Sequence, residues 1–207
     1  IKDSYDARHD TAKSSINQQG TGCDLVSYVR TIDREFDVVV QNVDTILDID
    51  IAAFTESFSA PKHIGAVACI ALTRSPGVPN ENAYSVNGAG MVLHSAEFAD
   101  PSNVVQIASD QYRASSTGSV ILDSEFLRTN SWLPADGQLS IYSNILRDAW
   151  NQQRLYAHDN GTRFFRDIGT VATWLNSVSD PFLHTLLNRR NIQAPIELHQ
   201  AEAQEVS

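Results

Sequence analysis

Apolar residues recur every three or four positions from Leu25 to Phe58. This spacing is typical of an amphipathic helix. From Phe36 to Ile51, however, the segment is rich in β-branched residues, and apolar positions alternate with aspartates, which is typical of a half-buried strand. Aspartate is also unfavourable inside a helix. We therefore predict a helix over Leu25–Arg34 and a strand over Phe36–Ile51, with one helix continuing to Phe58 as the alternative.

The middle of the chain has the pattern of a buried sheet. Ile64–Thr73 contains no polar residue before its last position, which predicts a strand buried on both faces. A second extended segment is expected over Ala83–Phe98, interrupted at Gly88-Ala89-Gly90. Between them, residues 74–82 have the proline, glycine and asparagine content of a loop. Two further short strands are expected at 104–108 and 119–122.

The last third of the chain changes to a helical period. Asp136–His158 and Thr162–Asn176 each place apolar residues on one face, with Asn160-Gly161 as a helix end between them. Asp180-Pro181 is typical of the start of a third helix. The predicted fold class is α+β, with a β-rich middle over residues 36–123 followed by a helical C-terminal third. We expect a single domain over 23–191, a polar N-terminal arm over 1–22 and a polar C-terminal tail over 192–207.

The charge balance limits the partners. Only 15 lysines and arginines stand against 25 acidic residues, so the net charge is -10, and lysine occurs only at Lys2, Lys13 and Lys62. Nucleic acid and anionic membrane surfaces are disfavoured, because both are bound through clustered basic residues. No apolar run approaches the ~20 residues that a transmembrane helix needs. The remaining polar residues are mostly short or neutral. Because lysine and glutamate are depleted at protein interfaces, this composition favours packing against other proteins.

Motifs that would identify a catalytic site are absent from the sequence. Gly88-Ala89-Gly90 lacks the third glycine and the helix start of a dinucleotide site. No Gly-x-Ser-x-Gly nucleophile motif occurs, and no pair of cysteines has zinc-site spacing. We therefore assign no residue to catalysis, to cofactor binding or to metal binding, and we expect no cofactor.

Four acidic residues and three histidines are isolated candidates for a site. Asp44, Asp48 and Asp50 could line one strand face as a cation or acid–base cluster, but they lack the organised loop of a calcium site, so a solvated face is favoured. The remaining candidates are assigned structural positions: His94 with Glu97 at a strand end, His158 at a helix end and His184 at the edge of the core.

The cysteines and a possible glycosylation sequence also have structural explanations. Cys23 and Cys69 are expected to be free thiols, with Cys69 as a small buried residue. Asn160-Gly161-Thr162 fits the acceptor pattern for N-glycosylation, but helix termination explains the same residues and is favoured. Trp150 and Trp174 fall on apolar helix faces, which favours packing over ligand binding.

These observations favour a structural, self-assembling subunit of the capsid, tube or filament type over an enzyme. Its partners would be further copies of itself, in a homo-oligomer, or other protein subunits. Its localisation would be a virion or an extracellular assembly. A start at Ile1 is compatible with processing from a precursor. Two alternatives are kept. One is a hydrolytic or metal-dependent enzyme with a site assembled from dispersed Asp and His residues, and the other is an extracellular recognition domain that uses the 74–90 loop.

Overall fold

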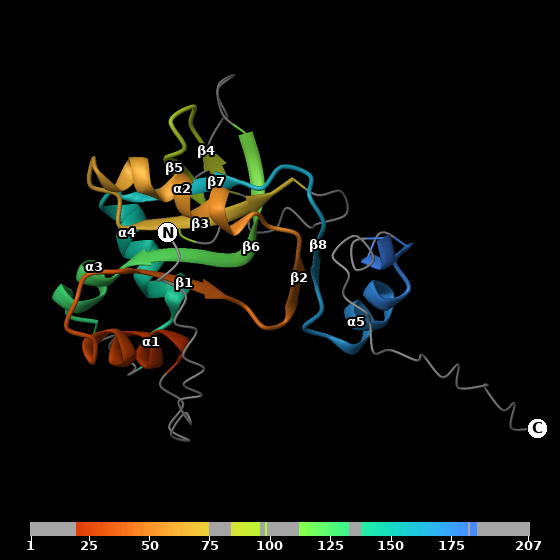
Figure 1. Ribbon diagram of the computed structural model, residues 1–207, viewed down its shortest axis with the longest axis horizontal. Coiled ribbons are helices and arrows are strands. Elements are labelled where there is room, and N and C mark those ends of the chain that lie inside the picture. The colour runs from red at the N-terminus through yellow and green to blue at the C-terminus, as the bar shows by residue number, and fades with distance from the viewer. Residues whose placement is uncertain are drawn as a thin grey trace, which may run out of the picture.

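The computed structural model describes residues 20–74, 84–95, 98, 112–132, 138–181 and 183–185 (Figure 1). Most of the expected N-terminal arm, the C-terminal tail, the 74–82 loop and the expected strand at 104–108 lie outside these residues. Helices and a central sheet are both present, so the predicted α+β class is confirmed. No helix in the described ranges is long and apolar enough to cross a membrane.

A six-stranded sheet forms the centre of the molecule, with strand order β5-β4-β6-β3-β7 and with β1 also paired to β6. Every pairing is antiparallel except that of β3 with β7, which is parallel. The strands of this sheet are β1 (Asp37–Gln41), β3 (Ala68–Thr73), β4 (Tyr84–Val86), β5 (Val92–Ser95), β6 (Tyr112–Asp123) and β7 (Leu155–Asp159).

Strand β6 is long enough to have different neighbours along one edge. Its first part pairs with β4 and its last part, from Ser119 to Asp123, pairs with β1. Between the two parts the register with β3 shifts, and Gly118 adopts a left-handed φ of 78°. Thr117 lies at the same irregularity, and its hydroxyl donates to the Ala71 carbonyl at 2.9 Å, which satisfies a β3 acceptor inside the protein.

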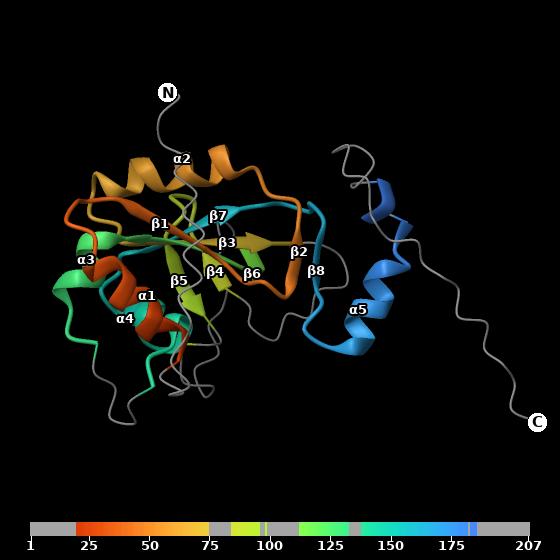
Figure 2. The same ribbon diagram turned by 60° about the horizontal axis from the view of Figure 1, so that its bottom comes forward.

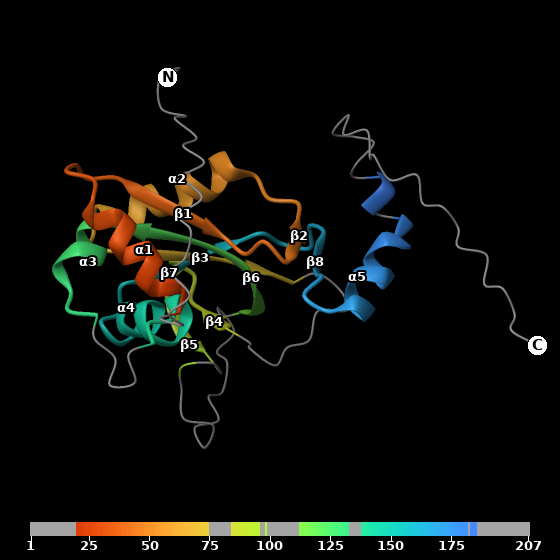
Figure 3. The same cartoon turned by 90° about the horizontal axis from the view of Figure 1, so that it is seen from below.

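Helices cover both faces of the sheet (Figures 2 and 3). Strand β3 is buried throughout, and its alternate residues enter two different cores: Ile70 and Leu72 join the larger core, whereas Cys69 and Ala71 join the smaller core beneath α2. Burial on both faces explains the continuous apolar run in the sequence. The helices are α1 (Thr21–Arg30), α2 (Ile51–Lys62), α3 (Ser124–Thr129), the π-helical turn η2 (Ile141–Leu146), α4 (Arg147–Asn151) and α5 (Val171–Val178).

The segment from Phe36 to Phe58 matches neither of the two predicted alternatives in full. It forms β1, a turn, a short strand β2 (Thr45–Leu47) and then the start of α2. Asp50 ends the extended part, because its side chain accepts the Ala53 N–H at 3.1 Å and caps α2. The strand prediction is therefore right for part of Phe36–Ile51, and the helical period applies only from Ile51 onward.

The prediction of a purely helical C-terminal third is wrong. The Asp136–His158 segment contains η2 and α4 but then enters the sheet as β7, and the Thr162–Asn176 segment starts as strand β8 (Phe165–Asp167) before α5. β8 pairs with β2 in a separate two-stranded sheet. Residues 181 and 183–185 are helical, as expected after Asp180. Helical periodicity failed here because sheet pairing with β3 and β2 outweighs local preference in these short segments.

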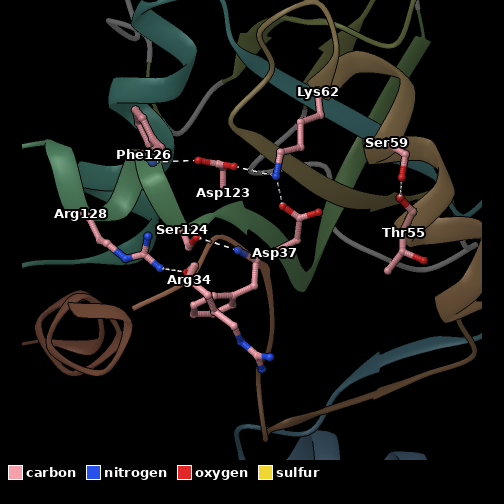
Figure 4. A network of polar contacts seen from close by, with 10 residues as sticks. Arg34, Asp37, Thr55, Ser59, Lys62, Asp123, Ser124, Phe126 and Arg128 are labelled. Atoms are coloured by element: carbon pink, nitrogen blue, oxygen red, sulfur yellow. Dashed lines mark hydrogen bonds and ion pairs between the residues drawn. The ribbon is translucent and has the colours of Figure 1, made fainter. Parts of the chain in front are cut away.

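A polar cluster fastens α2 to the central sheet (Figure 4). Lys62, in the last turn of α2, pairs with Asp37 of β1 at 2.5 Å and with Asp123 of β6 at 2.7 Å. The other carboxylate oxygen of Asp123 accepts the Phe126 N–H at 2.8 Å and caps α3. One aspartate therefore links a strand, two helices and the single lysine of the described chain.

Candidate active site

The turn between β1 and β2 is tied to the central strand β6. The Asn42 N–H donates to the Gly118 carbonyl at 2.9 Å. The Gln41 side-chain amide donates to the Thr45 hydroxyl at 2.7 Å, and this hydroxyl donates to the Asn42 carbonyl at 3.1 Å. The Ser119 hydroxyl donates to Gln41 Oε1. These bonds fix the backbone on both sides of residues 43 and 44.

The pairing of β2 with β8 brings a second acidic residue to the same turn. Thr45 stands opposite Asp167, and Leu47 stands opposite Phe165. Immediately beyond the strand pair, the Ile168 N–H donates to the Asp44 carbonyl at 2.8 Å. Asp44 precedes β2 and Asp167 ends β8, so antiparallel pairing places these two residues at the same end of the small sheet.

The side chains of Asp44 and Asp167 converge around Gly169. A Cβ atom built on this glycine would lie 3.2 Å from Asp44 Oδ2 and 3.1 Å from Asp167 Oδ1. The Gly169 N–H also donates to Asp167 Oδ1 at 2.8 Å, which orients that carboxylate. Both aspartates are exposed to solvent. The result is a solvent-facing carboxylate pair around a residue that has no side chain.

Two exposed carboxylates are suited to a divalent cation that prefers oxygen ligands. Mg²⁺ is commonly held by one or two carboxylates and completed by water and substrate phosphates. No group of three or more His, Cys, Asp or Glu side chains placed to hold a metal ion occurs among the described residues. Asp44 and Asp167 therefore fit a cation that shares its coordination with a substrate, and they do not fit a closed structural zinc site.

Helix α5 begins directly after the carboxylate pair. The Thr170 hydroxyl accepts the Thr173 N–H at 3.1 Å, and Thr173 Oγ1 accepts the Thr170 N–H at 3.0 Å, so α5 starts with a capping box. The positive end of the helix dipole accordingly lies beside the pair. The far end is held by Arg166, whose guanidinium pairs with Asp180 at 2.8 Å.

Asp44 is exposed to solvent, as was favoured for it, and it does not form a cation cluster with Asp48 and Asp50 among the described residues. Asp50 caps α2, and the carbonyl of Asp48 accepts Asn160 Nδ2 at 3.1 Å. Asp167 was not among the predicted candidates. The signal that could have identified it is its position: an aspartate at a strand end, followed by glycine and then a helix cap.

His158 lies in strand β7 and not at a helix end, so that prediction is wrong. Its Nδ1 is 3.1 Å from the Ser57 hydroxyl, and this hydroxyl donates to the Phe54 carbonyl at 2.7 Å. Because the single Ser57 proton is used there, His158 Nδ1 must be the donor. Burial lowers the pKa of His158, against an opposing effect of Asp159. Ser57 therefore acts as a structural hydroxyl rather than a nucleophile.

The other two candidate histidines, His94 and His184, lie in different elements. His94 lies in β5 opposite Ser85, as expected for a strand residue, and Glu97 lies outside the described residues. His184 is exposed beside the buried Leu183, so its predicted place at the edge of the core is wrong.

Both cysteines are free thiols, as predicted. Cys69 is completely buried, and burial raises the pKa of its thiol to about 12, against opposing effects of the Ser57 side chain and the His158 backbone. A thiol with such a high pKa is a poor nucleophile near neutral pH.

The glycosylation sequence and the tryptophans have clear positions. Asn160 is only 3% exposed, and its Nδ2, to which a glycan would be attached, is bonded to the Asp48 carbonyl. Trp150 packs against Phe98 with ring centroids 5.9 Å apart, as predicted. Trp174 is 45% exposed, so of the predicted core or interface packing the core role is wrong.

Solved structures of two proteins share the fold of this chain. HddC from Yersinia pseudotuberculosis aligns with a TM-score of 0.53 and 15% identity over 78% of this chain and 62% of that chain. The same protein complexed with GMP-PN aligns with a TM-score of 0.54, the same identity and the same coverage. The inositol-1-phosphate CTP transferase from T. maritima aligns with a TM-score of 0.55 and 11% identity over 86% of this chain and 65% of that chain.

At 11–15% identity, this likeness shows a shared fold. The chain spans less than two thirds of the length of these solved structures, at 62% and 65%. No protein-family model matches the sequence, and no curated protein matches it. The prediction of a capsid, tube or filament subunit in a virion is wrong, because the chain shares its fold with an enzyme, the inositol-1-phosphate CTP transferase. The absence of catalytic motifs from the sequence was weak evidence against an enzyme, since the carboxylate pair is assembled from segments that are far apart in the chain.

Proposed function

We propose that this chain is the cation-binding and acceptor-binding part of a nucleotidyltransferase. The single observation that carries the proposal is the convergence of Asp44 and Asp167 around Gly169. In nucleotidyl transfer a phosphate oxygen of the acceptor attacks the α-phosphorus of a nucleoside triphosphate, and the bond to pyrophosphate breaks. The name of one structural neighbour suggests a phosphorylated polyol as the acceptor class.

A divalent cation held by this pair would neutralise negative charge on the reacting phosphates. Asp44 and Asp167 would hold it, and the Gly169 N–H would keep Asp167 Oδ1 oriented. The absence of a side chain at Gly169 leaves the space between the two carboxylates open. The capped start of α5 adds positive potential next to the pair, which favours a phosphate group.

The acidic character of the protein makes the cation necessary. With a net charge of -10 and two exposed carboxylates at the site, a nucleoside triphosphate would be repelled by the protein alone. The Asp180 partner of Arg166 offsets one nearby positive charge. Substrate affinity should therefore depend strongly on the divalent cation.

Binding of Mn²⁺ tests this proposal directly. Titration followed by electron paramagnetic resonance should show a site that is weakened at least about tenfold by Asp44→Asn and by Asp167→Asn, since each removes a charged ligand. Asp33→Asn, which removes the same charge from an exposed loop, is the control and should bind Mn²⁺ as the unaltered protein does. Equal Mn²⁺ affinity in all four proteins would refute the assignment.

A further inference from the structure

We infer that the hollow beside α4 is a binding site for a neutral oligosaccharide. It has a volume of about 450 Å³ and lies between the segment after α3, η2 and α4. Cavities of this size hold small-molecule ligands. α4 lies at the opposite end of the molecule from β2, β8 and α5 in all three views, so this hollow is separate from the carboxylate pair (Figures 1, 2 and 3).

Two asparagines in the lining are each fixed through one end of the side-chain amide. Asn130 Nδ2 donates to the Phe126 carbonyl at 2.8 Å, and Asn144 Oδ1 accepts the Ser140 N–H at 2.7 Å. The opposite ends, Asn130 Oδ1 and Asn144 Nδ2, have no bond to another described residue. The lining therefore contains one further acceptor and one further donor on side chains whose entropy is already reduced.

The charged residues of the hollow favour a neutral ligand. Asp148 Oδ2 accepts Gln152 Nε2 at 2.9 Å, which leaves Oδ1 as a second acceptor, and Arg147 provides a neighbouring positive charge. An anion such as a nucleotide would meet Asp148 together with a single arginine. An apolar ligand would leave the amide groups unpaired, which is costly. Hydroxyl groups both donate and accept, so a polyhydroxylated ligand matches this set of groups.

Trp132 provides a fixed aromatic surface in the same lining. Its indole N–H donates to the Leu127 carbonyl at 3.0 Å, and its ring packs edge-on against Phe126 at 5.3 Å. The indole is thus held in one orientation before any ligand binds. Aromatic rings combine an apolar face with a polar edge, which suits the C–H face of a sugar ring.

A second hollow of about 220 Å³ extends the site around the end of α4. Asn151 lines both hollows, and the second also contains Trp150, whose indole N–H donates to the Leu93 carbonyl at 3.3 Å. Gln153, also in its lining, has a φ of 57° and ends α4 as a left-handed cap, with the Arg154 N–H donating to the Ala149 carbonyl at 2.8 Å. One fixed indole in each of two hollows that share Asn151 favours a ligand with several sugar rings.

Three tryptophan indole signals allow a direct test by ¹H–¹⁵N NMR. Neutral trisaccharides of glucose, mannose, galactose and N-acetylglucosamine are titrated into the labelled protein, with glucose as the single-ring comparison. At least one trisaccharide should shift the Trp132 and Trp150 indole signals in a saturable way and bind about tenfold more tightly than glucose, while Trp174 on α5 stays unchanged. If no trisaccharide gives a saturable shift, or if Trp174 shifts equally, the inference is wrong.

Matched asparagine variants locate the binding. Asn151→Ala should weaken the best trisaccharide about fivefold to tenfold, the effect of one or two lost hydrogen bonds. Asn176→Ala, an exposed substitution on α5, should have no effect. Unchanged indole signals without sugar show that each variant is folded. If Asn151→Ala binds the trisaccharide as tightly as the unaltered protein does, the assignment of the site is wrong. The inference does not rest on the proposed enzymatic function, so Asp44→Asn should bind the sugar as the unaltered protein does.

Discussion

Thr45 and Asp167 are direct partners in the antiparallel pair of β2 and β8, and this register decides where the carboxylates meet. Asp44 precedes Thr45, so it lies next to Asp167 although the two are far apart in sequence. A shift of one residue in this pairing would turn the side chains of β8 to the other face. The candidate site therefore depends on a two-stranded sheet of only three paired positions.

A methyl group at Gly169 should disturb the cation site without unfolding the protein. In Gly169→Ala the added Cβ would stand 3.1 and 3.2 Å from the two carboxylate oxygens, which must move apart. We expect Mn²⁺ affinity to fall about tenfold, the usual scale for disturbed ligand orientation. Gly88→Ala, which places the new methyl group in open space, is the control and should keep both affinity and melting temperature. Equal affinities in both variants would contradict the geometry of the pair.

Gly118 should be required for the turn that carries Asp44. Gly118→Ala combines a φ of 78° with a Cβ placed 2.9 Å from Asn42 Nδ2. We expect a loss of about 1–3 kcal/mol in the free energy of unfolding, measured by urea denaturation. When Asn42→Gly is also present, the part of this loss that comes from the clash with Asn42 should disappear, and only the part from backbone strain should remain. If the loss is the same in both backgrounds, Asn42 is not the group that excludes the methyl.

Lys62 should stabilise the sheet through its two aspartates. Burial alone would lower the pKa of Lys62, but the bonds to Asp123 and Asp37 outweigh it, so the pKa is raised above 10.5. A raised pKa means that the stabilisation is complete below pH 10.5 and is lost as the pH rises through the folded-state pKa. Lys62→Met should lower the free energy of unfolding by about 1 kcal/mol near neutral pH, because a partly exposed pair is screened by solvent.

The difference in unfolding free energy between the unaltered protein and Lys62→Met should shrink at strongly alkaline pH. Asp37→Asn should cost less than Lys62→Met, since Asp37 is 37% exposed and the pair with Asp123, at 14%, remains. Urea denaturation across the alkaline range measures both effects. A difference that does not change with pH would show that Lys62 acts only through packing.

Protonation of His158 should destabilise the fold. Burial lowers its pKa below 6.5, so the unfolded chain binds the proton more readily than the folded chain. The contribution is therefore intact above pH 6.5 and is lost as the pH falls through the folded-state pKa. His158→Gln should lose less stability than the unaltered protein between about pH 7.5 and about pH 5. An NMR titration of the His158 ring that gives a pKa above 6.5 would contradict this prediction.

Several elements were predictable because their patterns are local. The pattern of Ile64–Thr73 predicts a strand buried on both faces, and β3, at Ala68–Thr73, is a strand whose residues are all buried. The helices after Asp50 and Asp180 begin at residues whose capping chemistry is visible in the sequence. In contrast, β7 was assigned to a helix, because a five-residue strand beside a parallel neighbour has no periodicity of its own.

The sequence by itself determined the α+β class, the free thiols, the buried strand β3 and the acidic surface, because these depend on residue types and short-range spacing. Only the tertiary structure decided that Asp44 meets Asp167 and not Asp48 or Asp50. Register between β2 and β8 is a long-range property that no local pattern encodes. The likeness to the solved structures became visible for the same reason, since the fold is shared at only 11–15% sequence identity.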